Sequence, residues 1–237
     1  MQTTEPRESQ IQNMQPEDLL RMCEVLRHRL RNIASGIRGA VSLIQEETQG
    51  QIANDLQEYF PLMVKECESL QDMANRLGMV FDNPNLQPST ETVQNITNAI
   101  LDDIAPQFPH VEFRKDYPQE ALAAPVAMGT ALQELIRNAC EAAPKGTVGV
   151  QATDIEKKIT WRVLDDGTAM DEEVRKKIFM PFFTTRPRHL GLGLSIARRI
   201  AKMHNGDCRL IQDDETPSKY AFELTCNAAH LPTQACS

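Results

Sequence analysis

The 237-residue sequence has no apolar run near the roughly 20 residues that a membrane-spanning helix requires. Its opening stretch, MQTTEPRESQIQNMQPEDLL, lacks the apolar core of a secretory signal peptide. Its six cysteines, at positions 23, 67, 140, 208, 226 and 236, lack the spacing of metal ligands or of a redox motif. These absences argue against a membrane span, secretion and a cysteine-bound metal. We therefore expect a cytoplasmic protein with reduced, mostly buried thiols.

The formal net charge of −8 argues against general binding to nucleic acid, whose phosphates attract basic surfaces. The composition is otherwise that of a globular protein, since 41% of the residues are hydrophobic and 24% are charged. The length allows one large domain or two small ones. The expected organisation is a flexible tail over 1–16, a helical hairpin over 17–79, a linker over 80–90, a mixed α/β domain over 91–228 and a tail over 229–237.

Two long amphipathic helices are predicted before the linker. Apolar residues recur there at steps of three and four, which is typical of one helix face. They are Leu19, Met22, Leu26, Leu30, Ile33, Ile37, Val41 and Ile44, and then Ile52, Leu56, Phe60, Met63, Cys67, Leu70, Met73 and Leu77. The polar stretch TQGQ, residues 48–51, separates the two series, so we expect an antiparallel hairpin. Because two helices alone cannot cover both stripes, a dimeric four-helix bundle is expected.

The pattern changes to mixed helices and strands after the Asn- and Pro-rich stretch FDNPNLQPST. Helices are expected over 91–105, 127–143 and within 191–206, and strands over 110–116, 147–154, 158–165, 207–212 and 219–226. Gly206 is expected to end the last helix in the left-handed conformation.

Two segments of this second domain carry polar groups that suit binding of a metal ion and of a base. In ELIRNACEA, Glu134 and Asn138 lie one helical turn apart on the same face, and an Asn amide oxygen suits Mg²⁺, which prefers oxygen ligands. In VLDDGTAM, Asp165 ends a predicted strand and can accept a hydrogen bond from an exocyclic amine of adenine. Gly167 follows it and lets the backbone turn beneath the base.

Two further segments come later in the same domain. IFMPFFTTR offers apolar residues that could anchor a flap, followed by Arg186, whose charge could reach a phosphate. LGLGLS places Gly191 and Gly193 at the start of a helix, where bare amides and the positive helix end form a seat for phosphate.

The order of these four segments, over about sixty residues, resembles the ATP-binding domain shared by gyrase, the Hsp90 chaperone, sensor histidine kinases and MutL. PFFTTR close before GLGLSIARRI is similar to the histidine-kinase branch, and the resemblance covers residues 91–226. It implies an α/β sandwich with a mixed sheet, and hence an α+β chain that binds ATP and Mg²⁺. The resemblance implies that Asn138 binds Mg²⁺ and that Glu134 positions the metal or a water. It implies that Asp165 binds adenine and that Gly167 shapes the adenine pocket. The implied phosphate contacts are Arg186, Gly191 and Gly193.

Two positions depart from the family pattern. Ala169 replaces the second glycine of the Asp-x-Gly-x-Gly motif, and a positive φ there would strain alanine by about 1 kcal/mol. His189 stands where the family often has the first glycine of a Gly-x-Gly-x-Gly run. Both departures predict weakened rather than absent ATP binding.

The resemblance draws attention to His28 in LRHRLRNIASGIRGA. His28 lies two residues past Leu26, about 200° around the helix, and so points away from the apolar stripe. The sequence His-Arg-Leu-Arg-Asn resembles the phospho-acceptor box of histidine kinases, and GIRGAVSLI resembles the nitrogen-regulation-type subgroup. Arg29 replaces the usual acidic residue, and a guanidinium cannot act as a general base. Asn32 matches a position that orients water in the family's phosphatase reaction, or it is simply an exposed helix residue.

We therefore expect a homodimeric histidine kinase that phosphorylates His28 from Mg-ATP and passes the phosphoryl group to an aspartate in the receiver domain of a response regulator. Its signal would arrive through a partner, such as a separate sensor protein, or through the bundle itself, and no direct contact with nucleic acid is expected. The alternative is a histidine phosphotransfer adaptor or response-regulator phosphatase with a weakened ATP domain, which Arg29 and Ala169 favour. A serine-kinase anti-sigma factor is a third possibility, which the histidine on the hairpin disfavours.

Overall fold

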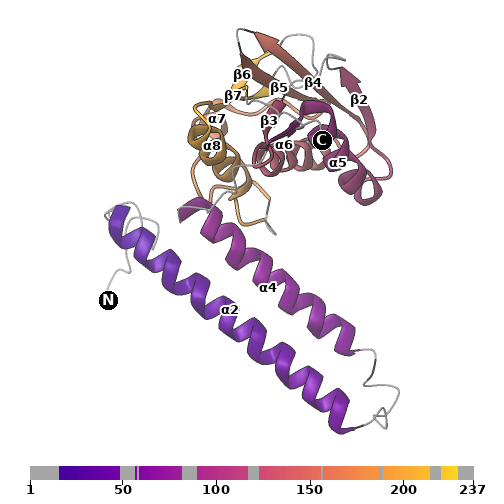
Figure 1. Cartoon of the computed structure of the whole chain (residues 1–237), viewed down its shortest axis with the longest axis vertical. Coiled ribbons are helices and arrows are strands. Elements are labelled where there is room, and N and C mark those ends of the chain that lie inside the picture. The colour runs from indigo at the N-terminus through magenta and orange to yellow at the C-terminus, as the bar shows by residue number, and fades with distance from the viewer. Residues whose placement is uncertain are drawn as a thin grey trace, which may run out of the picture. The chain divides into compact units, whose positions relative to one another are not determined.

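The structure is a computed structural model that describes residues 16–48, 57, 59–81, 90–116, 123–155, 157–186, 189–213 and 220–228. The chain divides into two compact units, residues 1–84 and residues 85–237 (Figure 1). The expected tails and most of the expected linker lie outside the described residues. Within the described part of the chain, no helix combines the length and the apolar character needed to cross a membrane.

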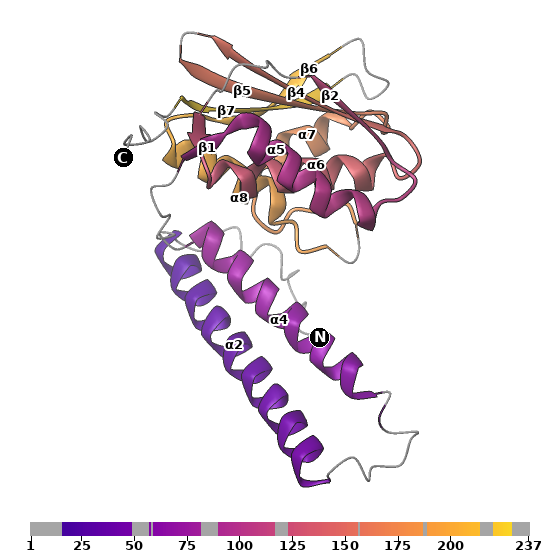
Figure 2. The same cartoon turned by 45° about the vertical axis from the view of Figure 1, so that its right-hand side comes forward.

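The first unit is a pair of long helices, α2 (Pro16–Glu47) and α4 (Tyr59–Phe81), which pack side by side (Figures 1 and 2). Proline is favoured at a helix start because the first N–H groups of a helix have no carbonyl partner within it, so the lack of an N–H breaks no helical hydrogen bond. Two hydrogen bonds show that the helices run antiparallel: Arg31 Nη2 donates to Asn75 Oδ1 at 3.4 Å, and Arg38 Nη2 donates to Gln71 Oε1 at 2.8 Å. The predicted helical hairpin therefore forms within this unit.

The buried line of the hairpin differs from the predicted stripe. Mostly small residues fill the contact between the helices: Cys23, Ala34 and Val41 from α2, and Cys67, Ala74, Leu77 and Val80 from α4. Four residues of the stripe predicted on α2 are exposed instead, namely Leu26, Ile33, Ile37 and Ile44, and Val41 of the same stripe is buried. At about 100° per residue, this exposed row lies roughly 60–70° around α2 from the buried line. Helix α2 thus presents two neighbouring apolar lines, of which α4 covers one.

The second unit is built on a five-stranded sheet in the order β2-β4-β5-β7-β6. Its strands are β2 (Glu112–Asp116), β4 (Thr147–Ile155), β5 (Lys158–Asp165), β6 (Cys208–Gln212) and β7 (Tyr220–Asn227). Strand β2 is parallel to β4, and the other neighbours are antiparallel. A separate antiparallel pair joins β1 (Thr90–Thr92) to β3 (Ala123–Pro125). This confirms the predicted α+β class with a mixed sheet, although β1 and β3 are too short for periodicity to reveal.

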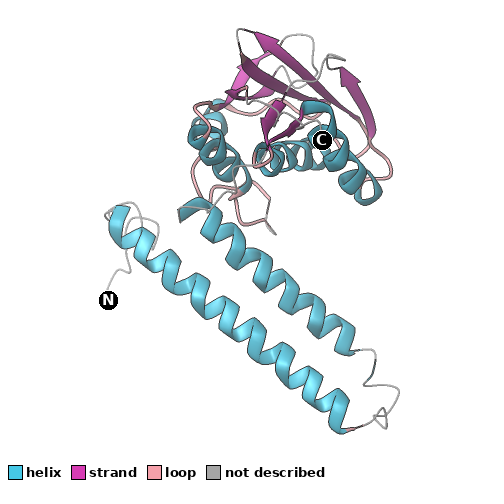
Figure 3. Ribbon diagram, viewed as in Figure 1, coloured by secondary structure: helices cyan, strands magenta, loops and turns pink. Residues whose placement is uncertain are grey.

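Helices α5 (Val93–Ile104), α6 (Met128–Ala142) and α8 (Gly193–Met203) lie on one face of the sheet (Figures 2 and 3), with the short 3₁₀ turn η1 (Ala105–Gln107) and helix α7 (Glu172–Lys177) beside them. The core lies between the helices and the sheet. Trp161 of β5 is fully buried there, and its indole N–H donates to Thr97 Oγ1 on α5 at 3.2 Å. The Thr97 hydroxyl donates in turn to the Val93 carbonyl at 2.7 Å, so both polar groups are satisfied.

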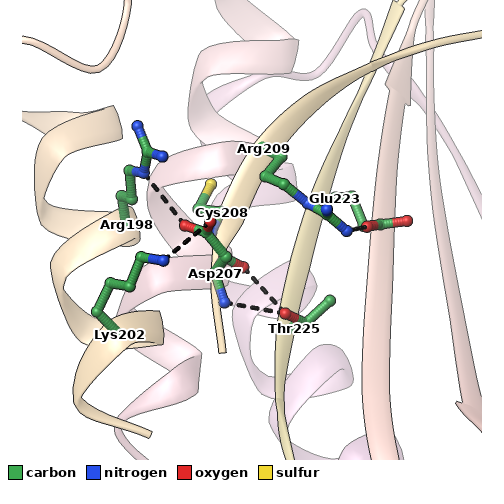
Figure 4. A network of polar contacts seen from close by, with 7 residues as sticks. All are labelled: Arg198, Lys202, Asp207, Cys208, Arg209, Glu223 and Thr225. Carbon is green, nitrogen blue, oxygen red and sulfur yellow. Dashed lines mark hydrogen bonds and ion pairs between the residues drawn. The ribbon is translucent and has the colours of Figure 1, made fainter. Parts of the chain in front are cut away.

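The end of α8 is anchored to the sheet by a polar network. Arg198 Nε and Lys202 Nζ of α8 lie 3.1 and 3.0 Å from the Asp207 carboxylate, and the Asp207 amide donates to Thr225 Oγ1 at 2.9 Å (Figure 4). The same view shows Arg209 of β6 beside Glu223 of β7, 2.5 Å apart. These contacts add to the packing of the buried apolar face of α8, which holds the helix against the sheet.

The helix α8 does not end as the sequence predicted. Asn205, with φ of 57°, takes the left-handed conformation, and Gly206 does not. The Gly206 amide donates to the Ala201 carbonyl at 2.8 Å and the Asn205 amide to the Lys202 carbonyl at 3.2 Å, which together form a Schellman cap. Gly206 is needed for another reason, since a Cβ there would collide with the Thr225 carbonyl.

Candidate functional site

One face of α6 carries a row of polar side chains at helical spacing. Glu134, Asn138 and Glu141 are half-buried along it. The opposite face packs into the core through residues that share full burial: Ala131, Leu132, Leu135, Ile136, Ala139 and Cys140. This amphipathic division fixes the rotation of α6, so the polar row cannot turn inward.

Asp165 and Gly167 form a tight turn at the end of β5. The Gly167 amide donates to Asp165 Oδ1 at 2.8 Å, and Asp165 is only 9% exposed. Burial raises the pKa of the Asp165 carboxyl above its ordinary value, and neighbouring Asp166 adds to this, while the Gly167 amide and Arg186 offset part of it. The result is a nearly buried acceptor with a defined orientation, which suits recognition of an amine.

Only glycine fits at position 167. A Cβ there would lie 2.5 Å from Asp165 Oδ1 and 3.1 Å from the Ala142 side chain of α6. The close approach brings the turn directly against the end of the α6 polar row. Asp165 and the α6 row therefore belong to one region of the domain.

The segment before α8 also requires a glycine. Gly191 has φ of 65°, and a Cβ there would collide with the Phe183 carbonyl. Helix α8 begins at Gly193, and no side chain among the described residues caps its first turn. The N–H groups of its first turn point out of the helix at the positive end of the helix dipole, so they can bind an anion.

Arg186 connects this segment to α6. Its Nη1 donates to Glu141 Oε2 at 2.5 Å and to Asn138 Oδ1 at 3.3 Å. His189 Nδ1 lies 3.5 Å from the same Glu141 oxygen. Asn138 and Arg186 were predicted from the sequence, and Glu141 was not. The only sequence signal of Glu141 is its position three residues after Asn138 on the same helix face.

Ala169 carries no backbone strain in the structure. Among the described non-glycine residues, only Lys157, Phe182 and Asn205 have a positive φ. Ala169 therefore does not have the positive φ at which alanine would cost free energy. Backbone strain at Ala169, the reason given for weakened ATP binding, was a wrong prediction. Phe182, at φ of 66°, is the strained residue of the flap segment instead.

The two hairpin residues of the predicted site belong to the other unit. His28 and Asn32 are both exposed on α2, and Arg27 Nη2 lies 3.4 Å from His28 Nε2. The structure thus presents an accessible imidazole beside a guanidinium. Within the second unit, Gly167 contacts Asp165 and Arg186 contacts Asn138, while Gly191 and Gly193 lie at the start of α8.

The polar side chains of this region fit a magnesium ion that takes some of its oxygen ligands from phosphates. Within the described ranges, no group of three or more His, Cys, Asp or Glu side chains could hold a metal by itself. Mg²⁺ normally takes only one or two protein oxygens and completes its octahedron with phosphate and water. Asn138 Oδ1 is a suitable protein oxygen, and Glu134 lies one turn before it.

Residues 123–229 match the family of histidine kinase-, DNA gyrase B-, and HSP90-like ATPases, so the second unit belongs to that class of ATP-binding domain. Within this class, the chain as a whole is related to the sensor histidine kinases. The relation extends over the hairpin as well as the ATPase domain, because the matching proteins cover most of the chain.

Signal transduction histidine-protein kinase AtoS of Escherichia coli (strain K12) is 30% identical over 224 residues, 87% of this chain and 35% of that protein. Sensory histidine kinase/phosphatase NtrB of Azospirillum brasilense is 24% identical over 227 residues, 86% of this chain and 54% of that protein. Full-length ShkA in complex with AMPPNP has a similar fold, with a TM-score of 0.72 and 19% identity over 88% of this chain and 46% of that chain. The chain therefore spans only about a third to a half of the length of these relatives.

Proposed function

We propose that the chain is an ATP-dependent protein-histidine kinase that phosphorylates His28. The observation that carries this proposal is the assembly of Asp165, Gly167, Asn138 and the uncapped start of α8 in one ATPase domain, in a chain whose hairpin exposes a histidine. Asp165 would accept from the adenine amine, and the α8 amides would receive the phosphates. Magnesium, held by Asn138, would neutralise charge on the phosphates during transfer.

In the proposed reaction, an imidazole nitrogen of His28 attacks the γ-phosphorus. A nitrogen–phosphorus bond forms as the bond to the bridging oxygen breaks, and ADP leaves with that oxygen. The ring then releases the proton of its other nitrogen to water. In a second step, a receiver-domain aspartate takes the phosphoryl group: an oxygen–phosphorus bond forms as the nitrogen–phosphorus bond breaks, and the leaving ring takes up a proton from water to become neutral imidazole again.

The exposed apolar row of α2 supports a homodimer. Leu26, Ile33, Ile37 and Ile44 form a continuous line that α4 leaves uncovered. Packing this line against a second copy would make the four-helix bundle that the sequence predicts. His28 lies roughly 160° around α2 from the row, so it stays accessible to the ATPase domain and to a regulator. The protein would work in the cytoplasm.

Labelling with γ-labelled ATP and Mg²⁺ tests the proposal. Wild type should gain an acid-labile, alkali-stable label, and His28→Ala and Asn138→Ala should each lose it. His110→Ala is the matched control, because His110 is exposed in a turn of the ATPase domain and should leave the label unchanged. A label that persists in His28→Ala would overturn the acceptor assignment.

The second candidate is a phosphotransfer adaptor or regulator phosphatase, which the arginine at position 29 favours. If wild type takes no label from ATP but accepts phosphate at His28 from a phosphorylated regulator, the adaptor is supported instead. Loss of regulator dephosphorylation in Asn32→Ala would support the phosphatase.

The effect of Arg29 is directly testable. Arg29→Glu restores the acidic residue that the family places after its histidine and can accept a proton, so the autophosphorylation rate should rise about tenfold or more. Arg31→Glu, which reverses a charge on the same exposed helix, is the control. An unchanged or lower rate in Arg29→Glu would show that Arg29 does not limit the reaction.

A further inference from the structure

The contact between Arg186 and the α6 row has a consequence for metal binding. Arg186 Nη1 reaches Glu141 Oε2 and Asn138 Oδ1 together, at 2.5 and 3.3 Å. All three side chains are partly buried, with 32% exposure for the Arg186 side chain and 21% for Glu141. A partly buried, charge-assisted pair is less screened than a surface pair, so Glu141 is the stronger of the two partners.

The Asn138 oxygen cannot serve Arg186 and a divalent cation equally well. An amide oxygen has two lone pairs, so it can accept more than one partner in principle. A guanidinium and Mg²⁺ in direct contact with the same oxygen would nevertheless repel each other strongly. Occupation of Asn138 by one cation therefore disfavours occupation by the other.

We propose that Glu141 is a positioning residue that holds Arg186 against Asn138 before nucleotide arrives, so that the guanidinium competes with the divalent cation for the Asn138 amide oxygen. This inference rests on the proposed ATP binding. When Mg-ATP enters, Arg186 leaves Asn138 and turns to the phosphates, which offer it a richer set of acceptors. His189 Nδ1 lies 3.5 Å from the same Glu141 oxygen, so a second side chain of this segment is close to Glu141.

The proposal predicts that loss of the Glu141 charge lowers the Mg²⁺ concentration that nucleotide binding requires. Glu141→Gln keeps the size of the side chain but removes its charge, so Arg186 is held less firmly and Asn138 is freed. The Mg²⁺ concentration for half-maximal nucleotide binding should fall about fivefold, a typical effect for loss of one partly exposed ion pair. At saturating Mg²⁺, the affinities of wild type and variant should converge.

The measurement is stopped-flow binding of a fluorescent ATP analogue to the full chain over a series of Mg²⁺ concentrations. Glu173→Gln is the control, since Glu173 is exposed on α7 and pairs with Lys176 at 3.1 Å. Arg186→Gln is the second variant, and it should also bind at lower Mg²⁺ while losing affinity at saturating Mg²⁺ because its phosphate contact is gone. Glu141→Asp, which retains the charge, should restore most of the wild-type Mg²⁺ dependence.

Two results would overturn the inference, and each differs from failure of ATP binding itself. If wild type binds nucleotide and Glu141→Gln has the same Mg²⁺ dependence, Arg186 does not compete for Asn138. If Glu141→Gln binds more weakly at every Mg²⁺ concentration, Glu141 instead orients Arg186 toward the phosphates. If wild type binds no nucleotide at all, the proposed function fails instead.

Discussion

The hairpin and the ATPase domain bury different kinds of side chain. The largest fully buried residues all lie in the ATPase domain, among them Trp161, Met128 and Leu132. The hairpin buries mostly small residues and leaves nine large hydrophobic residues exposed in the described part of the chain, against four in the larger ATPase domain. The ATPase domain therefore completes its own core, whereas a single hairpin does not complete one.

This difference separates two sources of stability. Small residues such as Ala34 and Ala74 let α2 and α4 approach closely, but they remove little apolar surface from water. Large apolar residues in the ATPase domain remove much more. Damage to the core should therefore unfold the ATPase domain alone, and damage to the exposed row of α2 should change association rather than the ATPase domain.

The largest effect is expected from Trp161→Ala. Trp161 is fully buried, and its removal leaves a cavity and takes the indole donor away from Thr97 Oγ1, so the ATPase domain should lose about 3–5 kcal/mol of unfolding free energy. Urea denaturation followed by far-UV circular dichroism measures this loss. Arg162→Ala, an exposed neighbour on the same strand, should change it by less than about 1 kcal/mol. A loss of that small size in Trp161→Ala would mean that Trp161 contributes little to the stability of the core.

The second effect tests the hairpin. Ile33→Glu places a charge in the middle of the exposed apolar row, and a symmetric dimer would bury it twice. The dimer should weaken by at least about 3 kcal/mol, roughly a hundredfold in dissociation constant, as sedimentation equilibrium would show. Ser35→Glu is the control, because Ser35 lies roughly 200° around α2 from Ile33. Unchanged dimerisation in Ile33→Glu would place the dimer contact on another face.

The elements that periodicity describes well were predicted within about two residues. Strands β4 and β5 and helix α6 have long, regular patterns of apolar residues, so their type and approximate bounds follow from the sequence alone. Strands β1 and β3 and helix α7 are too short to carry such a pattern. The stripe on α2 shows another limit, because hydrophobic spacing cannot tell which of two adjacent apolar lines faces the partner helix.

Local motifs identified the candidate site residues, whose roles stay predictions, and three details of the structure depended on tertiary contacts. Asn138, Asp165 and Gly167 lie on neighbouring elements, as expected if they share a nucleotide. Glu141 was missed because its partner Arg186 is 45 positions away in sequence and meets it only after folding. The roles of Gly206 and Ala169 depend on φ angles that the surrounding contacts impose, which residue type alone does not specify.

The smallest effect is expected from Asp207→Asn, which tests how the ATPase domain holds α8. Burial alone would raise the pKa of Asp207, but hydrogen bonds from Lys202, the Cys208 amide and Arg198 together bring it below its ordinary value. The charged form is therefore favoured in the folded state. Its stabilisation is fully present above the unfolded pKa of about 3.8 and is lost as pH falls through the lower folded pKa.

At neutral pH, Asp207→Asn should cost on the order of 1 kcal/mol, or about 3 °C in Tm for a domain of this size, because Asn cannot pair with both cations. Below the folded pKa of Asp207, the two proteins should have the same Tm, since wild type has then lost the charge as well. Calorimetry across the acid range measures both, and Asp102→Asn, an exposed carboxylate on α5, is the control. A Tm difference that persists in acid would mean that Asp207 acts through packing rather than charge. The ATPase domain would then hold α8 in place by packing alone.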